Sequence, residues 1–118
     1  MHEIFLDELK KLNARFMEMG VLVNDLIDRG TRSFVEHDKK AAQQMIAEDK
    51  EVAKEAVKIE KKALELMALQ QPVATDFRVV ISILKATTDL ERIEKMLIAL
   101  LLKLSELKVI HVCQMLKR

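Results

Sequence analysis

Aromatic residues are scarce in this sequence, which contains no tryptophan, no tyrosine and four phenylalanines. Proteins that bind single-stranded nucleic acids usually stack the bases on aromatic side chains, so this composition argues against such a function. Cysteine is scarcer still, because Cys113 stands alone. A single thiol excludes an internal disulfide, offers no pair of metal-binding thiolates and fits a reducing compartment.

The sequence also lacks a long hydrophobic run and a dominant charge. Its longest apolar run, from Met96 to Leu102, has seven residues, whereas a membrane-spanning helix needs about 20. The N-terminal segment carries acids such as Glu3 and Asp7 in place of the basic and apolar regions of a signal peptide. Charged residues make up 33% of the chain, yet the net charge is +1, which attracts neither nucleic acid nor an anionic membrane. We therefore expect a cytoplasmic protein with no membrane span and no nucleic-acid partner.

Hydrophobic residues recur at alternating spacings of three and four, a pattern typical of helices that pack at a shallow angle. The chain has 118 residues, of which 50% are hydrophobic, so one domain with a sizeable core is expected. The first periodic set is Phe5, Leu9, Leu12, Phe16, Met19, Val23, Leu26 and Gly30. The second is Ala42, Met45, Asp49, Val52, Ala56, Ile59, Ala63, Leu66 and Gln70. The third begins with Val73, Phe77, Val80 or Ile81, and Leu84.

The residues that interrupt helices are few, with two glycines and one proline in the whole chain. Gly20 and Gly30 fall inside the first periodic segment, where each costs about 1 kcal/mol relative to alanine, so we expect a neighbouring helix to approach closely at both. Pro72 suits the first turn of a helix and would end the second helix and begin the third. Asp38 is placed to cap the second helix through the amides of Lys40 or Ala41.

These patterns predict an all-α protein, an elongated antiparallel three-helix bundle that forms one domain over residues 1–118. Short links near residues 37 and 71 favour this arrangement, because they force neighbouring helices to run in opposite directions. The lysine- and glutamate-rich positions between the hydrophobic ones are expected to form a solvated face. The C-terminal extension to residue 118 could continue the third helix, fold back or fray. The expected helices cover about residues 3–36, 39–70 and 72–105.

The stretch around the proline, LQQPVATDFR at residues 69–78, is followed by Leu84-Lys85 and then by Asp89-Leu90-Glu91-Arg92-Ile93. This string resembles the PhoU family of phosphate-uptake regulators, whose pattern is close to L-x-Q-Q-P-V/M-A-x-D-L-R, then L-K, then D-L-E-R-I-G-D. The match from Leu69 to Ile93 is specific, and a looser similarity extends over the whole chain. Family members look like tandem pairs of three-helix repeats, and this chain has room for one.

The resemblance implies a cytoplasmic, dimer-forming regulator without catalytic activity. Such a protein would link a phosphate ABC transporter, through its ATPase, to a sensor histidine kinase, and keep phosphate-starvation genes off when phosphate is plentiful. The alternative is a structural or oligomerisation module that has lost the second repeat and the metal motif of the family. An enzyme is not expected: no histidine (His2, His37 or His111) follows a glutamate by three residues, which disfavours a Glu-x-x-His di-iron bundle.

The family is also associated with metal clusters held by the two acids of an E-x-x-x-D motif within D-L-E-R-I-G-D. Here Glu91 matches the first acid, but Lys95 replaces the second and Glu94 replaces the glycine. Counted from a turn near residue 71, Asp49 should lie level with about residue 93, so we expect an ion network of Asp49, Glu91, Arg92 and Lys95 in place of a cluster. No cofactor is expected, and iron or zinc binding should be weak or absent. The open alternative is that Lys95 points to solvent and Glu91, a weak candidate ligand, binds a metal with help from a second chain.

Two further expectations concern partners. The residues of the matched stretch that we take as candidates for a partner-binding surface are Gln71, Asp76, Arg78 and Asp89. Asp76 could instead interact favourably with the dipole of the third helix, and Arg78 could pair with an acid or stay exposed.

The run from Met96 to Leu102 is apolar on all sides, which a lone bundle cannot cover. We therefore expect a second copy of the chain to cover it in a homodimer or higher homo-oligomer.

Overall fold

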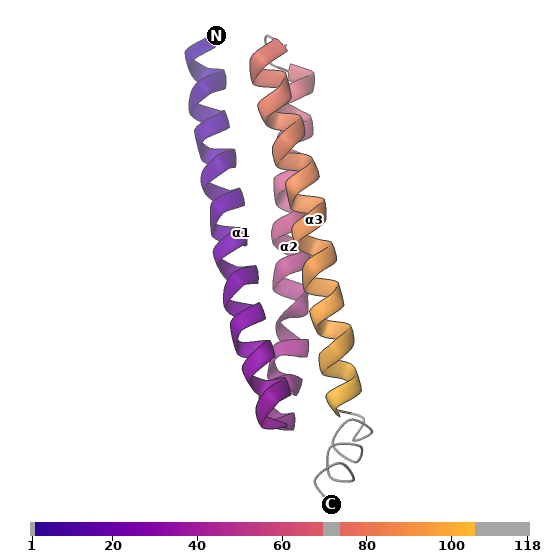
Figure 1. Cartoon of the computed structure of the whole chain (residues 1–118). Helices are drawn as coiled ribbons and strands as arrows, with labels where there is room; N and C mark the ends of the chain where they lie inside the picture. Colours follow the sequence, from indigo (N-terminus) through magenta and orange to yellow (C-terminus); the bar gives the residue numbers. More distant parts are fainter. Residues whose placement is uncertain (1, 70–73, 106–118) are drawn as a thin grey trace, which may run out of the picture.

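The computed structural model describes residues 2–69 and 74–105 of the chain. Within these residues the fold consists of three α-helices, α1 (His2–Glu36), α2 (Lys39–Leu69) and α3 (Ala74–Ser105). The helices lie side by side as long rods, and α2 runs in the opposite direction to α1 and α3 (Figure 1). The prediction of an all-α, antiparallel three-helix bundle is confirmed. The predictions made for Pro72, Gln71 and the C-terminal extension fall outside the described residues.

A two-residue link connects α1 to α2. His37 adopts a left-handed backbone with a φ of 57°, and the amide of Asp38 donates a hydrogen bond of 2.9 Å to the carbonyl oxygen of Ser33. This is the arrangement in which helices often end, with histidine in the place that glycine usually takes. Asp38 Oδ1 then accepts a hydrogen bond of 3.1 Å from the amide of Ala41. The predicted helix cap at Asp38 is confirmed.

The core runs along the facing sides of the three helices, and the described residues of the periodic sets predicted for α1 and α2 lie along it, Gln70 being outside the described range. Val73, the first residue of the set predicted for α3, lies outside the described residues. The prediction was wrong at Phe77, which is 44% exposed, and is confirmed at Val80, which is buried. From Val80 the α3 set continues with Ile83, and each later position follows by three or four residues, with the half-buried Leu90 between Thr87 and Glu94. The buried side chains of this α3 set are Val80, Ile83, Thr87, Glu94, Leu97 and Leu101.

The two glycines of α1 differ in what they pack against. A Cβ atom built on Gly30 would lie 2.6 Å from Leu97 Cδ1, so the missing side chain lets α3 approach α1 closely there. At Gly20 a Cβ atom would meet nothing within 4 Å. The expected close approach of a neighbouring helix is therefore confirmed at Gly30 and wrong at Gly20.

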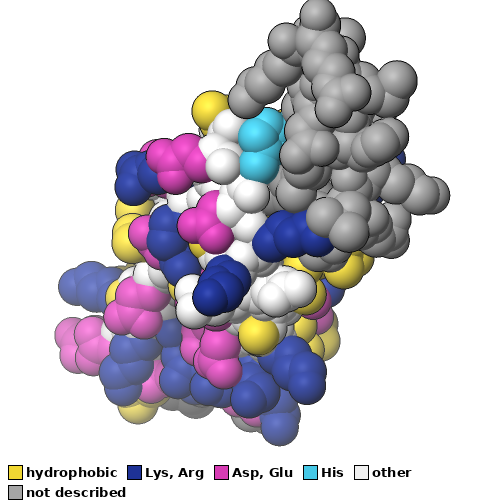
Figure 2. Space-filling view, turned by 90° about the horizontal axis from the view of Figure 1, so that it is seen from below, with side chains coloured by type: hydrophobic (Ala, Val, Ile, Leu, Met, Phe, Trp, Pro, Cys, Tyr) yellow, Lys and Arg dark blue, Asp and Glu magenta, His cyan; other side chains and the backbone are white. Residues whose placement is uncertain are grey.

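Charged side chains of both signs are interspersed over the end of the bundle where α1 meets α2 (Figure 2). Pairs one helical turn apart, such as Lys54 with Glu51 at 3.8 Å and Lys58 with Glu55 at 3.7 Å, are solvated on the surface of α2. Across the described residues, none of the helices combines the length and the hydropathy that crossing a membrane requires.

Candidate functional site

Two consecutive acids of α2, Glu48 and Asp49, contact different helices at the same level of the bundle. Glu48 reaches toward α1, whereas Asp49 reaches toward α3. Lys95 Nζ lies 3.1 Å from Asp49 Oδ1 and 3.2 Å from Oδ2, so the ammonium group bridges the carboxylate across the α2–α3 interface. The expected meeting of Asp49 with Lys95 is present, and it forms the centre of the candidate site.

Glu94 lies beside this pair and is almost completely buried, with 1% of the residue exposed. Ser33 and Thr87, the other two buried polar residues in the described part of the chain, each donate to a main-chain carbonyl oxygen, Thr87 Oγ1 to that of Ile83 at 2.7 Å. Glu94 has no such partner among the described residues, since both of its carboxyl oxygens are buried without a hydrogen-bond donor. An ionised carboxylate in this position would be costly.

The pKa values of the two neighbouring acids, Glu94 and Asp49, are shifted in opposite directions. Burial first, and then the neighbouring carboxyl of Asp49, raise the pKa of Glu94 to about 8. At Asp49 burial also acts to raise the pKa, but the interactions with Glu94 and with the ammonium group of Lys95 outweigh it, so the pKa is lowered. Bonding to Asp49 raises the pKa of Lys95 in turn. The pair therefore holds a neutral Glu94 next to an ionised Asp49 at neutral pH.

The remaining members of the predicted ion network lie apart from this centre. Arg92 is exposed, and its Nη1 atom lies 4.0 Å from Oδ1 of Asp89 on the same helix. The prediction that Arg92 faces Asp49 was therefore wrong. Its position follows from the α3 set, because Glu94 rather than Arg92 occupies the inward face. Glu91 is partly buried, and burial followed by the charge of Glu60 raises its pKa. Of the four predicted members, Lys95 and Asp49 form the ion pair across the interface.

The other predicted candidates are separated from the centre along α3. Asp76 lies in the first turn of α3 with Oδ2 buried and without a hydrogen-bond partner among the described residues. Arg78 is exposed and lines a shallow hollow with Phe16 of α1. The structure does not bring Asp76, Arg78 or Asp89 together with the Asp49–Lys95 pair.

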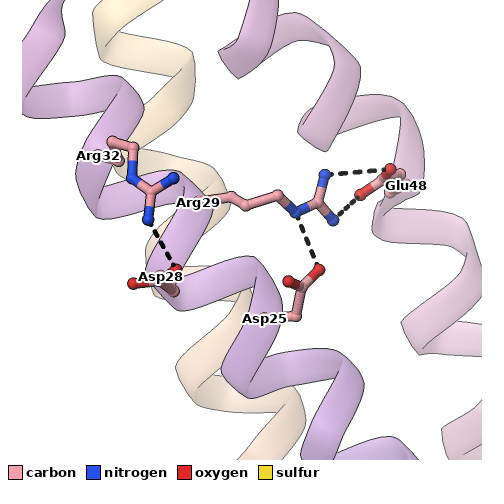
Figure 3. Close-up of polar contacts among 5 residues, drawn as sticks. All are labelled: Asp25, Asp28, Arg29, Arg32 and Glu48. Atoms are coloured by element: carbon pink, nitrogen blue, oxygen red, sulfur yellow. Dashed lines mark hydrogen bonds and ion pairs between the residues drawn. The ribbon is translucent and has the colours of Figure 1, made fainter.

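On the other side of α2, Arg29 joins α1 to Glu48 (Figure 3). Its Nη2 atom lies 2.6 Å from Glu48 Oε2, and its Nε atom lies 2.9 Å from Asp25 Oδ2. Arg29 and Glu48 are 38% and 40% exposed at their side chains. The guanidinium group thus clamps α1 to α2 at the surface, where water screens the charges.

A second polar contact between α1 and α2 lies nearer the N-terminus. Glu8 Oε2 is 2.6 Å from Lys62 Nζ, and Glu8 Oε1 is 3.3 Å from Lys11 Nζ. Hydrogen bonds from Lys62 and Lys11 lower the pKa of Glu8. A hollow of about 530 Å³ opens beside it, lined by Glu8, Lys11, Leu12, Arg15, Lys58, Lys61, Lys62 and Glu65. Apart from Leu12 its lining residues are charged, in agreement with the Lys/Glu pattern of the sequence.

Residues 16–95 match the family model described as "PhoU domain". This range covers most of the three helices, including Asp49, Glu94 and Lys95. The chain belongs to the PhoU family. The resemblance drawn from the stretch Leu69 to Ile93 is thereby confirmed.

Individual relatives of the PhoU family agree with this assignment. The chain is 30% identical over 92 residues to the "Phosphate-specific transport system accessory protein PhoU homolog 2" of Mycobacterium tuberculosis, which covers 78% of this chain and 43% of that protein. It is 33% identical over 86 residues to a PhoU homolog of Pseudomonas putida and 34% identical over 89 residues to one of Rhizobium meliloti. Those matches cover 73% and 75% of this chain, and 34% and 38% of the relatives. The chain thus spans less than half the length of these PhoU relatives.

The polar centre does not suit an iron or zinc cluster of the kind associated with the PhoU family. Such clusters need several converging anionic donors, whereas the ammonium group of Lys95 occupies the two oxygens of Asp49. Glu94, which replaces the family's glycine, stays buried and neutral beside them. In the described parts of the chain, no three or more His, Cys, Asp or Glu side chains converge in a way that could hold a metal ion.

Glu94 was missed as a site residue by sequence reasoning, which noted only that it replaces a glycine of the family motif. The signal was available, because counting three and four residues from Val80 through Ile83 and Thr87 leads to positions 90, 94 and 97. The set predicted for the third helix ended at Leu84 and was not continued to position 94.

Proposed function

We propose that this chain is a non-catalytic accessory protein of phosphate transport that acts in the cytoplasm through protein contacts. The match of residues 16–95 to the PhoU domain carries the proposal. The names of the relatives, "Phosphate-specific transport system accessory protein", support a role in phosphate transport. In its finer form, the chain links the ATPase of a phosphate ABC transporter to a sensor histidine kinase and represses the response to phosphate starvation.

Binding to the two proposed partners tests this function directly. The chain is immobilised, and the purified transporter ATPase and the cytoplasmic part of the sensor kinase from the same organism are passed over it separately. Saturable binding to either one supports the adaptor. The double variant Asp76→Asn/Arg78→Ala removes two charges from the start of α3, far from the polar centre, and is expected to weaken that binding without changing the unfolding temperature. Absence of binding to both partners contradicts the proposal.

The proposed adaptor is a homodimer, with α3 at the contact between copies. Ile93, Met96 and Leu100 follow one another by three and four residues and are 45%, 64% and 49% exposed, so they form an apolar stripe along the outer side of α3. The relatives are more than twice as long as the region they share with this chain. A second copy would supply a comparable amount of helical surface to cover the stripe.

Light scattering at micromolar concentration measures the oligomeric state. We expect the unmodified chain to be a dimer and the double variant Met96→Lys/Leu100→Lys to be a folded monomer. The matched control is Val57→Lys/Leu64→Lys, because Val57 and Leu64 are 60% and 58% exposed on α2 and lie outside the stripe. A monomeric unmodified chain, or equal dissociation in both double variants, contradicts the arrangement.

A structural or oligomerisation module is the second candidate function. The observation that favours it is the Asp49–Lys95 bridge, which ties α2 to α3 where the family motif has a metal-binding acid. The two candidates make opposite predictions in the binding experiment. A stable oligomer that ignores both the ATPase and the kinase domain is the result expected of a structural module.

Metal content is a separate test of the same polar centre. We expect the purified protein to contain well below one iron or zinc per chain by elemental analysis. Lys95→Asp restores the second acid of the motif and removes the ammonium group from Asp49, so this variant is expected to gain metal. Stoichiometric iron or zinc in the unmodified protein would support the alternative in which Glu91 binds metal with a second chain.

A further inference from the structure

Glu94 occupies a position in α3 that the helix pattern reserves for an apolar side chain. It lies one turn before Leu97, which packs against Gly30 of α1 at a closest distance of 2.6 Å from the site of a Cβ atom. The charged side chains of α1 at this level, Asp25 and Arg29, bond to each other, and Arg29 also bonds to Glu48 on the other side of α2. Gly30 has no side chain that could titrate or donate. The carboxyl group of Glu94 thus has an apolar wall on one side and α2 on the other.

Within residues 2–69 and 74–105, the charged groups that shift the pKa of Glu94 come from α2 and from α3 itself. Asp49 faces it from α2, and Lys95 and Glu91 flank it on its own helix. Lys95 Nζ is held by both oxygens of Asp49, at 3.1 and 3.2 Å, and donates no hydrogen bond to Glu94, whose two oxygens have no donor. When both acids are ionised, neither can donate a hydrogen bond to the other. A proton on Glu94 removes this conflict, because the acid can then donate to Asp49.

We propose that Glu94 and Asp49 form a proton-binding pair that makes the packing of α3 against α2 depend on pH. With the proton bound, Glu94 is a neutral donor to the Asp49 carboxylate, which Lys95 holds from the other side. Without it, two carboxylates share one ammonium group and the charge on Glu94 is buried without a hydrogen-bond donor, so the α2–α3 interface loosens at this level. The pair is a regulatory site whose ligand is the proton.

The direction of the pH dependence follows from the raised pKa of Glu94. In the unfolded chain Glu94 releases its proton near its ordinary value of 4.5, and in the folded chain only at about 8. Between these values the folded state binds more protons than the unfolded state, so stability falls as pH rises. The contribution of the pair is complete below about pH 4.5 and is lost as pH rises through 8.

The test compares thermal unfolding of the unmodified chain and of Glu94→Gln between pH 6 and pH 9. Glutamine has the shape of the protonated acid and keeps a donor for Asp49, but it cannot ionise. We expect the unfolding temperature of the unmodified chain to exceed that of the variant by no more than a few degrees at pH 6, and to fall relative to it by about 5–10 °C by pH 9. The control Glu65→Gln changes an exposed glutamate of α2 and should follow the unmodified chain at every pH.

Carbon NMR of the Glu94 carboxyl group gives a second measurement that does not depend on unfolding. We expect titration near pH 8 in the unmodified chain and a lower midpoint in Asp49→Asn, which removes the negative charge facing Glu94. Titration of Glu94 at an ordinary value near 4.5, or parallel pH profiles for Glu94→Gln and the unmodified chain, would overturn the proposal. Neither measurement involves a transporter or a kinase, so the result is independent of the proposed function.

Discussion

The two sides of α2 carry the same charges and differ in their access to water. Toward α1, Arg29 stands between two acids, Asp25 and Glu48. Toward α3, Lys95 is likewise accompanied by two acids, of which Asp49 is bound and Glu94 is buried beside it. Each group has one base and two acids. One of the acids in each group comes from α2, Glu48 in the first and Asp49 in the second.

The difference between the two groups lies in how the surplus negative charge is accommodated. Around Arg29 the side chains are between 38% and 56% exposed, so water screens both carboxylates and each can remain ionised. Around Lys95 the surplus acid is 1% exposed, and it stays neutral instead. Equal composition therefore gives a static clamp at the surface and a titrating pair in the interior.

Replacing the buried acid should have the largest effect. We expect Glu94→Met to raise the free energy of unfolding at pH 8 by about 2 kcal/mol, because it removes a buried carboxyl group while leaving the Asp49–Lys95 bridge intact. The gain should be smaller at pH 6, where the proton is retained. Denaturant titrations at both pH values measure it. The control Leu101→Met, at another buried position of α3, should lose less than about 1.5 kcal/mol, equally at both pH values.

Removing the cation of the interior group should have an intermediate and opposite effect. We expect Lys95→Met to lower the free energy of unfolding by about 1 kcal/mol, since Asp49 then loses its bridging ammonium group next to another acid. The expected loss of stability is small because the side chain of Lys95 is 55% exposed, so that water screens its charge. Lys85→Met on the same helix, where the lysine is exposed, should change stability by less than about 0.5 kcal/mol. An equal loss in both variants would mean that the bridge contributes nothing.

Removing the cation of the surface group should have the smallest effect. We expect Arg29→Met to lower the free energy of unfolding by about 0.5 kcal/mol at low salt, because exposed ion pairs contribute little. The loss should shrink further in about 1 M salt, where charges are screened beyond roughly 3 Å. Arg15→Met, an exposed arginine of the same helix, is the control. A salt-independent loss larger than that of Lys95→Met would reverse the comparison between the two sides.

Much of the fold could be predicted because it rests on local signals that repeat. The spacing of apolar residues identified the core faces of α1 and α2, and Asp38 marked the start of α2 through the usual chemistry of a helix cap. The start of the α3 set could not be settled in this way. Val79, Val80 and Ile81 are consecutive apolar residues, and only the packing against both neighbours shows that Val80 is the buried one.

The candidate site could be predicted in part. The sequence predicted that Asp49 and Lys95 lie at the same height in the bundle. This followed from counting residues along two antiparallel helices, since the rise per residue is constant. The orientation of Arg92 and the burial of Glu94 depend on how α3 is rotated about its axis, and that rotation is fixed by contacts such as Leu97 with Gly30. An error of one residue in the helix pattern turns each side chain by about 100°. For this reason the most unusual residue of the centre escaped prediction.

The link at His37 and Asp38 has a mechanical consequence. Two residues held by hydrogen bonds to the last turn of α1 and the first turn of α2 leave no slack for these helices to slide past each other, since a shift by one turn is 5.4 Å. A protein that binds α1 or α2 therefore cannot slide one of these helices along the other. Any movement passed along these two helices has to tilt or rotate them as one body.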